Sequence, residues 1–318
     1  MMKRLLLLSM ISAGIFSHSL RAETPGDGLM MSKNSFCQVL SYSQNSWSQY
    51  WESDVKRSNS NLGTFRSHIL TLMGAYGLTD DLNVIYSLPY VTTGFSDSYL
   101  SGYQGFQDVS LWLKYNAYTT ETSLGTLAFF GTVGGSIPTH NYVVNQLPAS
   151  IGMGTWSGSL RAVADFTTND GWYGTFQAGY TVRGESDIDE ESYFYNGRLY
   201  NTNSIPIPNA ADFTLRLGHI TSDYQVDAYF DRFTCVSGDD IRYNSMPTPT
   251  VMMQSSTIGL YGRYNIGMVS IMANASQVVA GRNFGQSTML NIGFGYIFQF
   301  GGGDEEEGGG AGGFRDRA

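Results

Sequence analysis

The sequence predicts an all-β protein, a transmembrane antiparallel up-and-down β-barrel of about 12 strands. Three observations predict this fold: an N-terminal export leader, strand-length segments in which apolar and polar residues alternate, and connections that are alternately short and long. Charged residues are only 14% of the chain, whereas an average globular protein has roughly 25%. In a membrane barrel only every second residue touches lipid, so the apolar residues are spread rather than blocked.

The first 22 residues have the features of a secretory signal peptide. MMKR is positively charged, LLLLSMISAGIF is apolar but too short to cross a bilayer as a helix, and Ala22 is a small residue suited to cleavage. We therefore expect 1–22 to be removed and the protein to reach the outer membrane of a Gram-negative bacterium. The mature chain then contains a periplasmic leader or plug over 23–35, a barrel over 36–300 and a disordered Gly-rich acidic periplasmic tail over 301–318.

The expected strands form an even-numbered set, as bacterial single-chain barrels require. They are predicted at 36–50, 64–78, 82–91, 106–116, 125–137, 156–167, 172–184, 211–221, 224–235, 255–265, 268–281 and 286–300. Short turns such as Thr79–Asp81 and Thr168–Gly171 alternate with long loops, of which 185–210 is the longest. This asymmetry is typical of short periplasmic turns and long outer loops. Pro89 is expected at an outer strand end, where pairing can lapse.

Charged residues on these strands mostly have the parity opposite to the apolar ones, which predicts that they point inward. A charge facing lipid at the midplane costs about 2–4 kcal/mol, which explains the segregation. Arg232 breaks the pattern, but it lies near a strand end, where the cost falls. The candidates for lining the lumen are Asp108, Trp112, Lys114, Phe130, Arg161, Asp165, Arg183, Arg216, Asp227, Tyr229, Asp231, Tyr261 and Arg263.

Two interpretations of these interior residues stay open. Either they form a ladder of ion pairs that fills a narrow barrel, or they line a polar passage with aromatic surfaces for an apolar solute. Barrels of about eight strands are filled by side chains and those of sixteen or more enclose a channel, so about twelve strands fits both.

Aromatic residues collect near the short turns and are expected to form a girdle at the lipid headgroups. They are Tyr76, Tyr115, Trp172, Tyr224 and Tyr264. The last strand, MLNIGFGYIFQF, resembles the C-terminal insertion signal of outer-membrane proteins through Tyr296, Phe298 and Phe300, although the tail follows it here. The outer-membrane assembly machinery is therefore an expected partner, together with membrane lipid and lipopolysaccharide.

Composition argues against several other classes of function. The formal net charge of −9 disfavours nucleic acid as a partner. The histidines show no metal-binding spacing, the glycine-rich stretches lack the lysine of a phosphate-binding loop, and we expect neither metal nor cofactor. Cys37 and Cys235 are expected at opposite ends of the barrel, too far apart for a disulfide. The acidic run 185–191 is either a cation site or a solvated loop beside lipopolysaccharide.

Several segments resemble one known family. YGLTDDLNVIYSLPYV (76–91), GFQDVSLWLKYN (105–116) and DGWYGTFQAGYTVRG (170–184) resemble outer-membrane proteins associated with the meta-cleavage pathway of phenol degradation, and the order of elements is similar over most of the mature chain. In that family a strand ends in a Tyr-Gly-Leu-Thr-Asp turn and the next ends in Leu-Pro-Tyr. The resemblance implies an outer-membrane barrel that helps small hydrophobic or aromatic compounds across the membrane, and it carries no catalytic residues.

The expected function is passive passage or uptake of small, hydrophobic or aromatic compounds. The alternative is a structural or surface-interaction barrel with a closed bore. The third hypothesis is an outer-membrane lipid hydrolase or protease using His68, His140 or His219, but no spacing brings a nucleophile and a base together, and we do not expect an enzyme.

Overall fold

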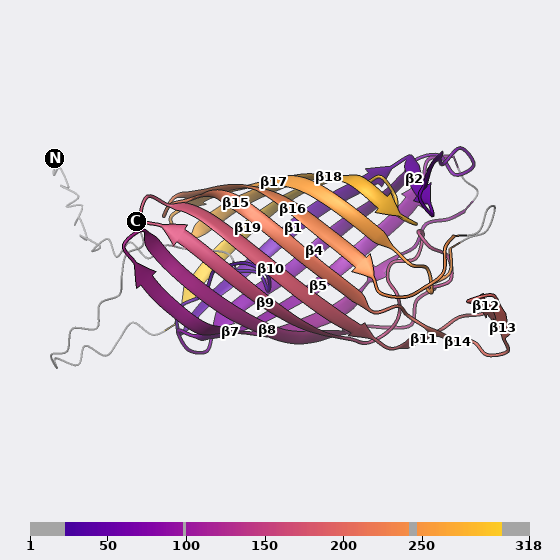
Figure 1. The fold of residues 1–318 in the computed structure, drawn as a ribbon, viewed down its shortest axis with the longest axis horizontal. Coiled ribbons are helices and arrows are strands. Elements are labelled where there is room, and N and C mark those ends of the chain that lie inside the picture. The colour runs from indigo at the N-terminus through magenta and orange to yellow at the C-terminus, as the bar shows by residue number, and fades with distance from the viewer. Residues whose placement is uncertain (1–22, 98–99, 242–246, 301–318) are drawn as a thin grey trace, which may run out of the picture.

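The computed structural model of the protein describes residues 23–97, 100–241 and 247–300. Twelve long antiparallel strands form one closed barrel, because each pairs with the next along the chain and the last, β19, pairs with the first, β1 (Figure 1). They are β1 (Ser35–Trp47), β4 (Phe65–Gly77), β5 (Leu82–Phe95), β7 (Asp108–Thr122), β8 (Gly125–Pro138), β9 (Ser157–Thr168), β10 (Trp172–Arg183), β15 (Ala210–Ile220), β16 (Tyr224–Cys235), β17 (Gln254–Ile266), β18 (Val269–Arg282) and β19 (Thr288–Gln299). The predicted fold class is confirmed.

Short strands that the sequence did not predict occur in the long loops. They are β2 (Gln49–Glu52), β3 (Val55–Ser58), β6 (Gln104–Phe106), β11 (Glu185–Asp187), β12 (Tyr193–Tyr195), β13 (Arg198–Tyr200) and β14 (Ser204–Pro206). The long loops gather at one end of the barrel, and β1 begins and β19 ends at the other, short-turn end (Figure 1). Within the described ranges, no helix is long and apolar enough to cross a membrane. The predicted signal peptide (1–22) and tail (301–318) lie outside the described residues.

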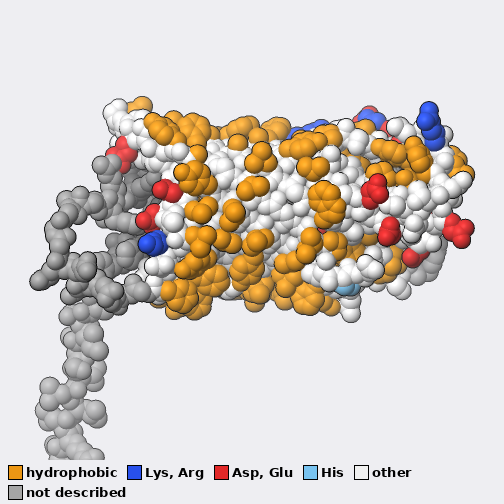
Figure 2. Space-filling view, turned by 90° about the horizontal axis from the view of Figure 1, so that it is seen from below, with side chains coloured by type: hydrophobic (Ala, Val, Ile, Leu, Met, Phe, Trp, Pro, Cys, Tyr) orange, Lys and Arg blue, Asp and Glu red, His pale blue; other side chains and the backbone are white. Residues whose placement is uncertain are grey.

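The outer wall is apolar, as the alternation predicts. Leu111, Leu160 and Leu260 are 57%, 66% and 64% exposed, while the residues beside them in the chain point inward. On the face shown in Figure 2, hydrophobic side chains cover much of the wall and charged side chains lie toward the two ends. Such a surface is stable only against an apolar medium, which is the environment that a bilayer supplies.

Aromatic residues of the predicted girdle all lie at the short-turn end. Tyr115, Trp172, Tyr224 and Tyr264 are exposed on the outside, and Tyr76 is half-buried with its hydroxyl donating to Asn34 Oδ1 at 3.3 Å. Tyr296 and Phe298 in β19 and Phe300 directly after it are also exposed, and Phe298 stacks on Phe36. Contact of these rings with lipid headgroups stays a prediction.

Two strands extend clearly beyond their predicted ends. β7 continues to Thr122, with a bulge between Asn116 and Tyr118. β5 continues to Phe95, so the expectation that Pro89 lies at a strand end is wrong. Proline is tolerated there because β5 changes partner: its pairing with β7 stops at Ser87 and resumes with β6 at Tyr90. No ladder bond is therefore lost through the missing N–H of proline.

Candidate functional site

The N-terminal segment lies inside the barrel. We call residues 23–34 the N-terminal plug, because side chains of this segment contact the inner wall of the barrel. Glu23 is 1% exposed, and its carboxylate accepts hydrogen bonds from Asn83 Nδ2 and from the Met31 backbone N–H. Met31 packs with Cys37, Ile85 and other apolar residues of the inner wall. The plug thus occupies part of the lumen toward the short-turn end.

Lys114 anchors the plug to the wall. Its side chain is fully buried, and its ammonium donates to the Thr24 carbonyl at 2.9 Å, to Asp27 Oδ1 at 2.7 Å and to the Leu29 carbonyl at 2.7 Å. Glu23 Oε1 lies 3.5 Å from the same nitrogen. An ammonium has three protons to donate, and here all of them have an acceptor. A buried charge saturated in this way stabilises the loop that supplies the acceptors.

Two glycines allow the plug to lie against the wall formed by β9 and β10. A Cβ on Gly26 would meet Gln177 Oε1 at 2.8 Å, and one on Gly28 would meet Asp165 Cγ at 2.3 Å. Asp27 lies between them and accepts a hydrogen bond from the Leu29 N–H at 3.1 Å, which closes the turn. The sequence Pro-Gly-Asp-Gly therefore forms a compact turn whose glycines meet the wall and whose aspartate meets Lys114.

The wall around the plug contains paired charges of both signs. Arg161 donates to Asp212 at 2.7 Å, and Arg216 donates to Asp227 at 3.0 Å. Asp227 also accepts from the Tyr173 hydroxyl at 2.6 Å. The Arg216–Asp227 pair joins the neighbouring strands β15 and β16, while the other two contacts each reach across one intervening strand. Such contacts are expected of an interior ladder that stiffens the wall.

All the predicted lumen candidates have the inward parity and are buried or half-buried. Asp165 accepts from Thr175, Asp231 from Thr214 and Asp108 from Tyr142, while Tyr229 donates to Asn274. Arg183 donates to the Pro208 carbonyl and lies over the Phe233 ring, and Arg216 lies over the Tyr229 ring. Trp112 and Tyr261 pack against the cluster around Met31, and Phe130 lies beneath Lys114.

Arg263 is the exception among these candidates. It is 3% exposed, and none of its three guanidinium nitrogens has a hydrogen-bond partner in the part of the chain that the structure describes.

Sequence reasoning missed several residues of this interior. Asp212 has the same inward parity as Arg216, which is a signal that identifies it. Glu23 and Asp27 precede the first strand, where no periodicity marks a side chain as interior.

Glu23 makes the seating of the plug dependent on pH. Burial raises the pKa of Glu23 from 4.5 to about 7, against the opposing effect of Lys114. The seated plug therefore binds this proton more tightly than a released plug does. Its contribution to seating is complete below pH 4.5 and is lost as the pH rises through about 7. We expect the conductance of the reconstituted barrel to rise over this range, and Glu23→Gln to flatten the profile; an unchanged profile in Glu23→Gln would exclude Glu23 as its origin.

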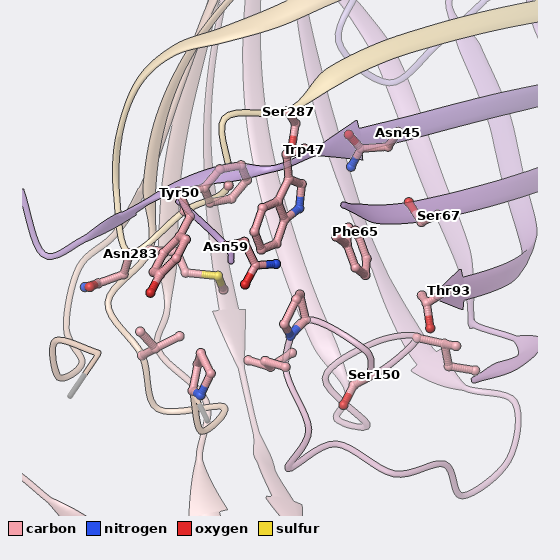
Figure 3. A pocket seen from close by; sticks show the side chains of 18 of the residues that line it. Asn45, Trp47, Tyr50, Asn59, Phe65, Ser67, Thr93, Ser150, Asn283 and Ser287 are labelled. Carbon is pink, nitrogen blue, oxygen red and sulfur yellow. The ribbon is translucent and has the colours of Figure 1, made fainter. Parts of the chain in front are cut away.

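A cavity lies at the long-loop end of the barrel, and we call it the mouth pocket (Figure 3). Its volume is about 360 Å³. It is formed by the ends of β1, β4 and β5 together with the loops after β1, β8, β16 and β18. The lining residues are Asn45, Trp47, Tyr50, Asn59, Leu62, Phe65, Ser67, Ile69, Val91, Thr93, Gln107, Leu147, Pro148, Ser150, Ile151, Ile241, Pro247, Val251, Met253, Asn283, Phe284, Gly285 and Ser287.

Aromatic rings form one side of the mouth pocket. The ring centroids of Trp47 and Phe65 are 5.4 Å apart, and those of Trp47 and Tyr50 are 6.0 Å apart. The indole lies directly over Gly285, where a Cβ would come within 2.6 Å of it. In Figure 3 the side chains of Trp47, Asn59 and Phe65 border the same space. This packing holds the rings in place along the mouth pocket.

The loop between β8 and β9 folds into the barrel and forms the opposite side of the mouth pocket. Ala149 is completely buried, and its carbonyl accepts a hydrogen bond from Thr93 Oγ1 at 2.5 Å. Ser150 and Ile151 of this loop line the mouth pocket. The loop therefore narrows the barrel between the mouth pocket and the plug.

Two polar atoms in the mouth pocket have unused hydrogen-bonding capacity. Asn45 Oδ1 and Asn59 Nδ2 are buried, and neither has a partner among the described residues. One is an acceptor and the other a donor, and both side chains line the same mostly apolar cavity. Buried polar atoms of this kind are costly unless a ligand or water pairs with them.

The interior contains further cavities below the mouth pocket. A cavity of about 360 Å³ shares Gln107, Leu147, Ser150 and Ile151 with it and reaches Asp108 and Arg183. Another, of about 220 Å³, lies between the plug and the wall. The lumen is thus a series of small spaces separated by the inward loop and the plug.

The histidines considered for catalysis lie in separate environments. His68 Nδ1 is 2.6 Å from the Tyr42 hydroxyl on the outer wall, while the neighbouring Ser67 points into the mouth pocket. His140 lies beside Thr139 in a loop, and His219 Nε2 donates to the Asp170 carbonyl at the short-turn end. Within the described ranges, no three His, Cys, Asp or Glu residues group as a metal site requires. Cys37 and Cys235 are both free.

The closed barrel, its apolar wall and its lined interior define an outer-membrane β-barrel protein. The model of the family described as "Putative MetA-pathway of phenol degradation" matches residues 58–294, and the chain belongs to this family. The resemblance found in the turn and strand motifs is thereby confirmed.

One solved structure has the same architecture, and others are less similar to the chain. The COG4313 outer membrane channel from Pseudomonas putida F1 is similar with a TM-score of 0.70 and 15% identity, over 87% of this chain and 100% of that one. The translocator domain of the autotransporter NalP from Neisseria meningitidis has a TM-score of 0.45 and 11% identity over 85% and 91% of the two chains. The Pseudomonas putida toluene transporter TodX has a TM-score of 0.38 and 10% identity, over 85% of this chain and 90% of that one. No curated protein matches the sequence. At these identities the first likeness supports the fold alone.

Proposed function

We propose that the protein is a passive outer-membrane channel for small apolar, chiefly aromatic, compounds. The observation that carries the proposal is the mouth pocket, an apolar cavity with an aromatic side at one end of a membrane barrel. Pockets for small ligands are typically apolar with a few placed polar groups, as here. Membership of a family named for phenol degradation supports an aromatic solute. The proposal includes no catalytic step.

We place the long loops outside the cell and the short turns and both termini in the periplasm. Outer-membrane barrels have short turns on the periplasmic side and longer loops on the extracellular side. The chain would reach this position after removal of 1–22, with β19 as the strand read by the assembly machinery. The mouth pocket then receives solute from outside, and the plug closes the periplasmic exit.

The ligand that fits the mouth pocket best is a flat apolar molecule with one hydroxyl group. Its ring would lie against Trp47 and Phe65, while its hydroxyl would donate to Asn45 Oδ1 or accept from Asn59 Nδ2. A hydroxyl group has both capacities, so it can pair with either amide. Release toward the periplasm requires the inward loop and the plug to move.

Uptake by proteoliposomes tests the function. Vesicles containing the protein should take up a labelled monohydroxylated aromatic faster than protein-free vesicles, with saturation at high solute concentration. A double variant, Asn45→Ala with Asn59→Ala, should reduce the preference for the hydroxylated compound over its unsubstituted parent by about tenfold, the effect of losing one or two hydrogen bonds. Impermeability to every solute tried would favour the alternative of a structural barrel with a closed bore.

A further inference from the structure

Arg232 occupies an exceptional place on the barrel. It has the lipid-facing parity of β16, and its cross-strand neighbours are Phe213 on β15 and Ser256 on β17. Phe213 is 38% exposed on the outer wall, so the guanidinium lies on the same outer surface. The residue is three positions from Cys235, at which β16 ends toward the long loops.

The charge of Arg232 has only neutral partners among the described residues. Its Nη1 donates to Ser256 Oγ at 2.8 Å, and its Nη2 donates to Gln254 Oε1 at 2.9 Å. No ion pair within the described ranges includes it. The two bonds orient the guanidinium without neutralising it. A half-buried cation at a lipid boundary is most stable when an anion from that boundary meets it.

An apolar groove begins directly beside this cation. On the outer wall, the next facing pair after Arg232 and Ser256, toward the short-turn end, is Phe230 and Ile258, and both line the groove. Its volume is about 680 Å³. Leu215 and Leu260 form further parts of the lining.

The groove forms because small side chains lie between larger ones on the outer wall. Ala228 on β16 and Ala275 on β18 lie in it between the larger side chains of the neighbouring strands. These four strands, β15 to β18, lie side by side in Figure 1. The groove therefore presents apolar carbon along the strands and a positive charge at its long-loop end.

We propose that this surface binds an anionic lipid of the outer leaflet, with an acyl chain in the groove and a phosphate group on Arg232. A guanidinium matches the oxygens of a phosphate, and here its outward edge remains free for one. With the long loops outside, Arg232 lies at the level of the outer leaflet, whose anionic lipid is lipopolysaccharide. The occupant is therefore the phosphorylated lipid A portion. The proposal rests on the orientation of the barrel and not on the channel activity.

Lipid binding to the purified full-length protein in neutral detergent tests this site. Native mass spectrometry would compare bis-phosphorylated lipid A with the same lipid after removal of its phosphates. We expect the phosphorylated form to bind about tenfold more tightly, as one charge-assisted contact implies. Arg232→Gln should abolish this preference, and Arg232→Lys should keep part of it, because a lysine retains the charge but not the paired donors.

Two matched variants separate a site from general surface charge. Arg66→Gln removes another exposed, outward-facing arginine at the same end of the barrel, on β4, and should leave the preference unchanged. Ala275→Leu fills the groove and should weaken the binding of the phosphorylated and the dephosphorylated lipid equally.

Three outcomes would overturn the proposal: an undiminished preference in Arg232→Gln, an equal loss in Arg66→Gln, or displacement of lipid by inorganic phosphate alone. Solute uptake by Arg232→Gln should equal that of the unchanged protein, so failure here is distinguishable from failure of the channel function.

Discussion

Replacing Lys114 by methionine is expected to release the N-terminal plug and to raise the conductance of the reconstituted barrel several-fold. The ammonium accounts for three hydrogen bonds to the plug and for the ion pairs with Asp27 and Glu23. Without it, the carboxyl groups of buried Glu23 and half-buried Asp27 lose their ammonium partner. Breaking a buried pair in this way costs about 3–5 kcal/mol, which shifts the balance of seated and released plug by about 10²- to 4 × 10³-fold. Single-channel recordings in planar bilayers measure the result.

Two further variants show whether the effect passes through the plug. Arg161→Gln removes a different interior cation, whose pairing is with Asp212 of the wall, and should leave the conductance nearly unchanged. Deletion of 23–34 should raise the conductance by itself, and Lys114→Met should then add nothing. If Lys114→Met increased conductance equally with and without the plug, Lys114 would act on the wall and not as an anchor.

Replacing Trp47 by alanine is expected to have the second largest effect, a loss of about 10- to 100-fold in apparent affinity for an aromatic solute. The indole forms one side of the mouth pocket and is held by Phe65 and Gly285. Losing the buried contact of one large side chain removes about 1.5–3 kcal/mol of binding. The concentration dependence of uptake, with a labelled monohydroxylated aromatic, measures it.

Trp172→Ala is the matched control for this prediction. Trp172 is equally large but lies on the outside of the barrel at the short-turn end, 61% exposed. Its loss should leave the concentration at half-saturation unchanged. Equal effects of the two substitutions would show that the mouth pocket does not bind the solute.

The strands of this protein follow from local sequence because each must present one apolar face to lipid. The alternation along β7, in which Leu111 and Leu113 face out while Trp112 and Lys114 face in, is enough to identify both the strand and its two sides. The alternation of loop lengths then identifies the barrel. The inward direction of Asp212, which is not among the predicted lumen residues, also follows from its having the same parity as Arg216.

The interior could not be predicted to the same depth. Lys114 and Thr24 are 90 positions apart, and no periodic signal connects them. The mouth pocket combines strand ends such as Trp47 with the inward loop around Ala149, whose path depends on a hydrogen bond to Thr93. The residues are individually ordinary, and their convergence is what makes a cavity.

By itself, the sequence determined an outer-membrane barrel of twelve strands, the two faces of each strand and the family to which the chain belongs. The physical reason is that every second residue of a strand faces lipid, so the membrane imposes an alternation of apolar and polar residues on neighbouring positions. Only the tertiary structure decided that the segment 23–34 occupies the lumen, that its anchor is Lys114 and that an aromatic-sided pocket lies at the opposite end. Those features arise from contacts between segments far apart in the chain, where no local pattern constrains the partner.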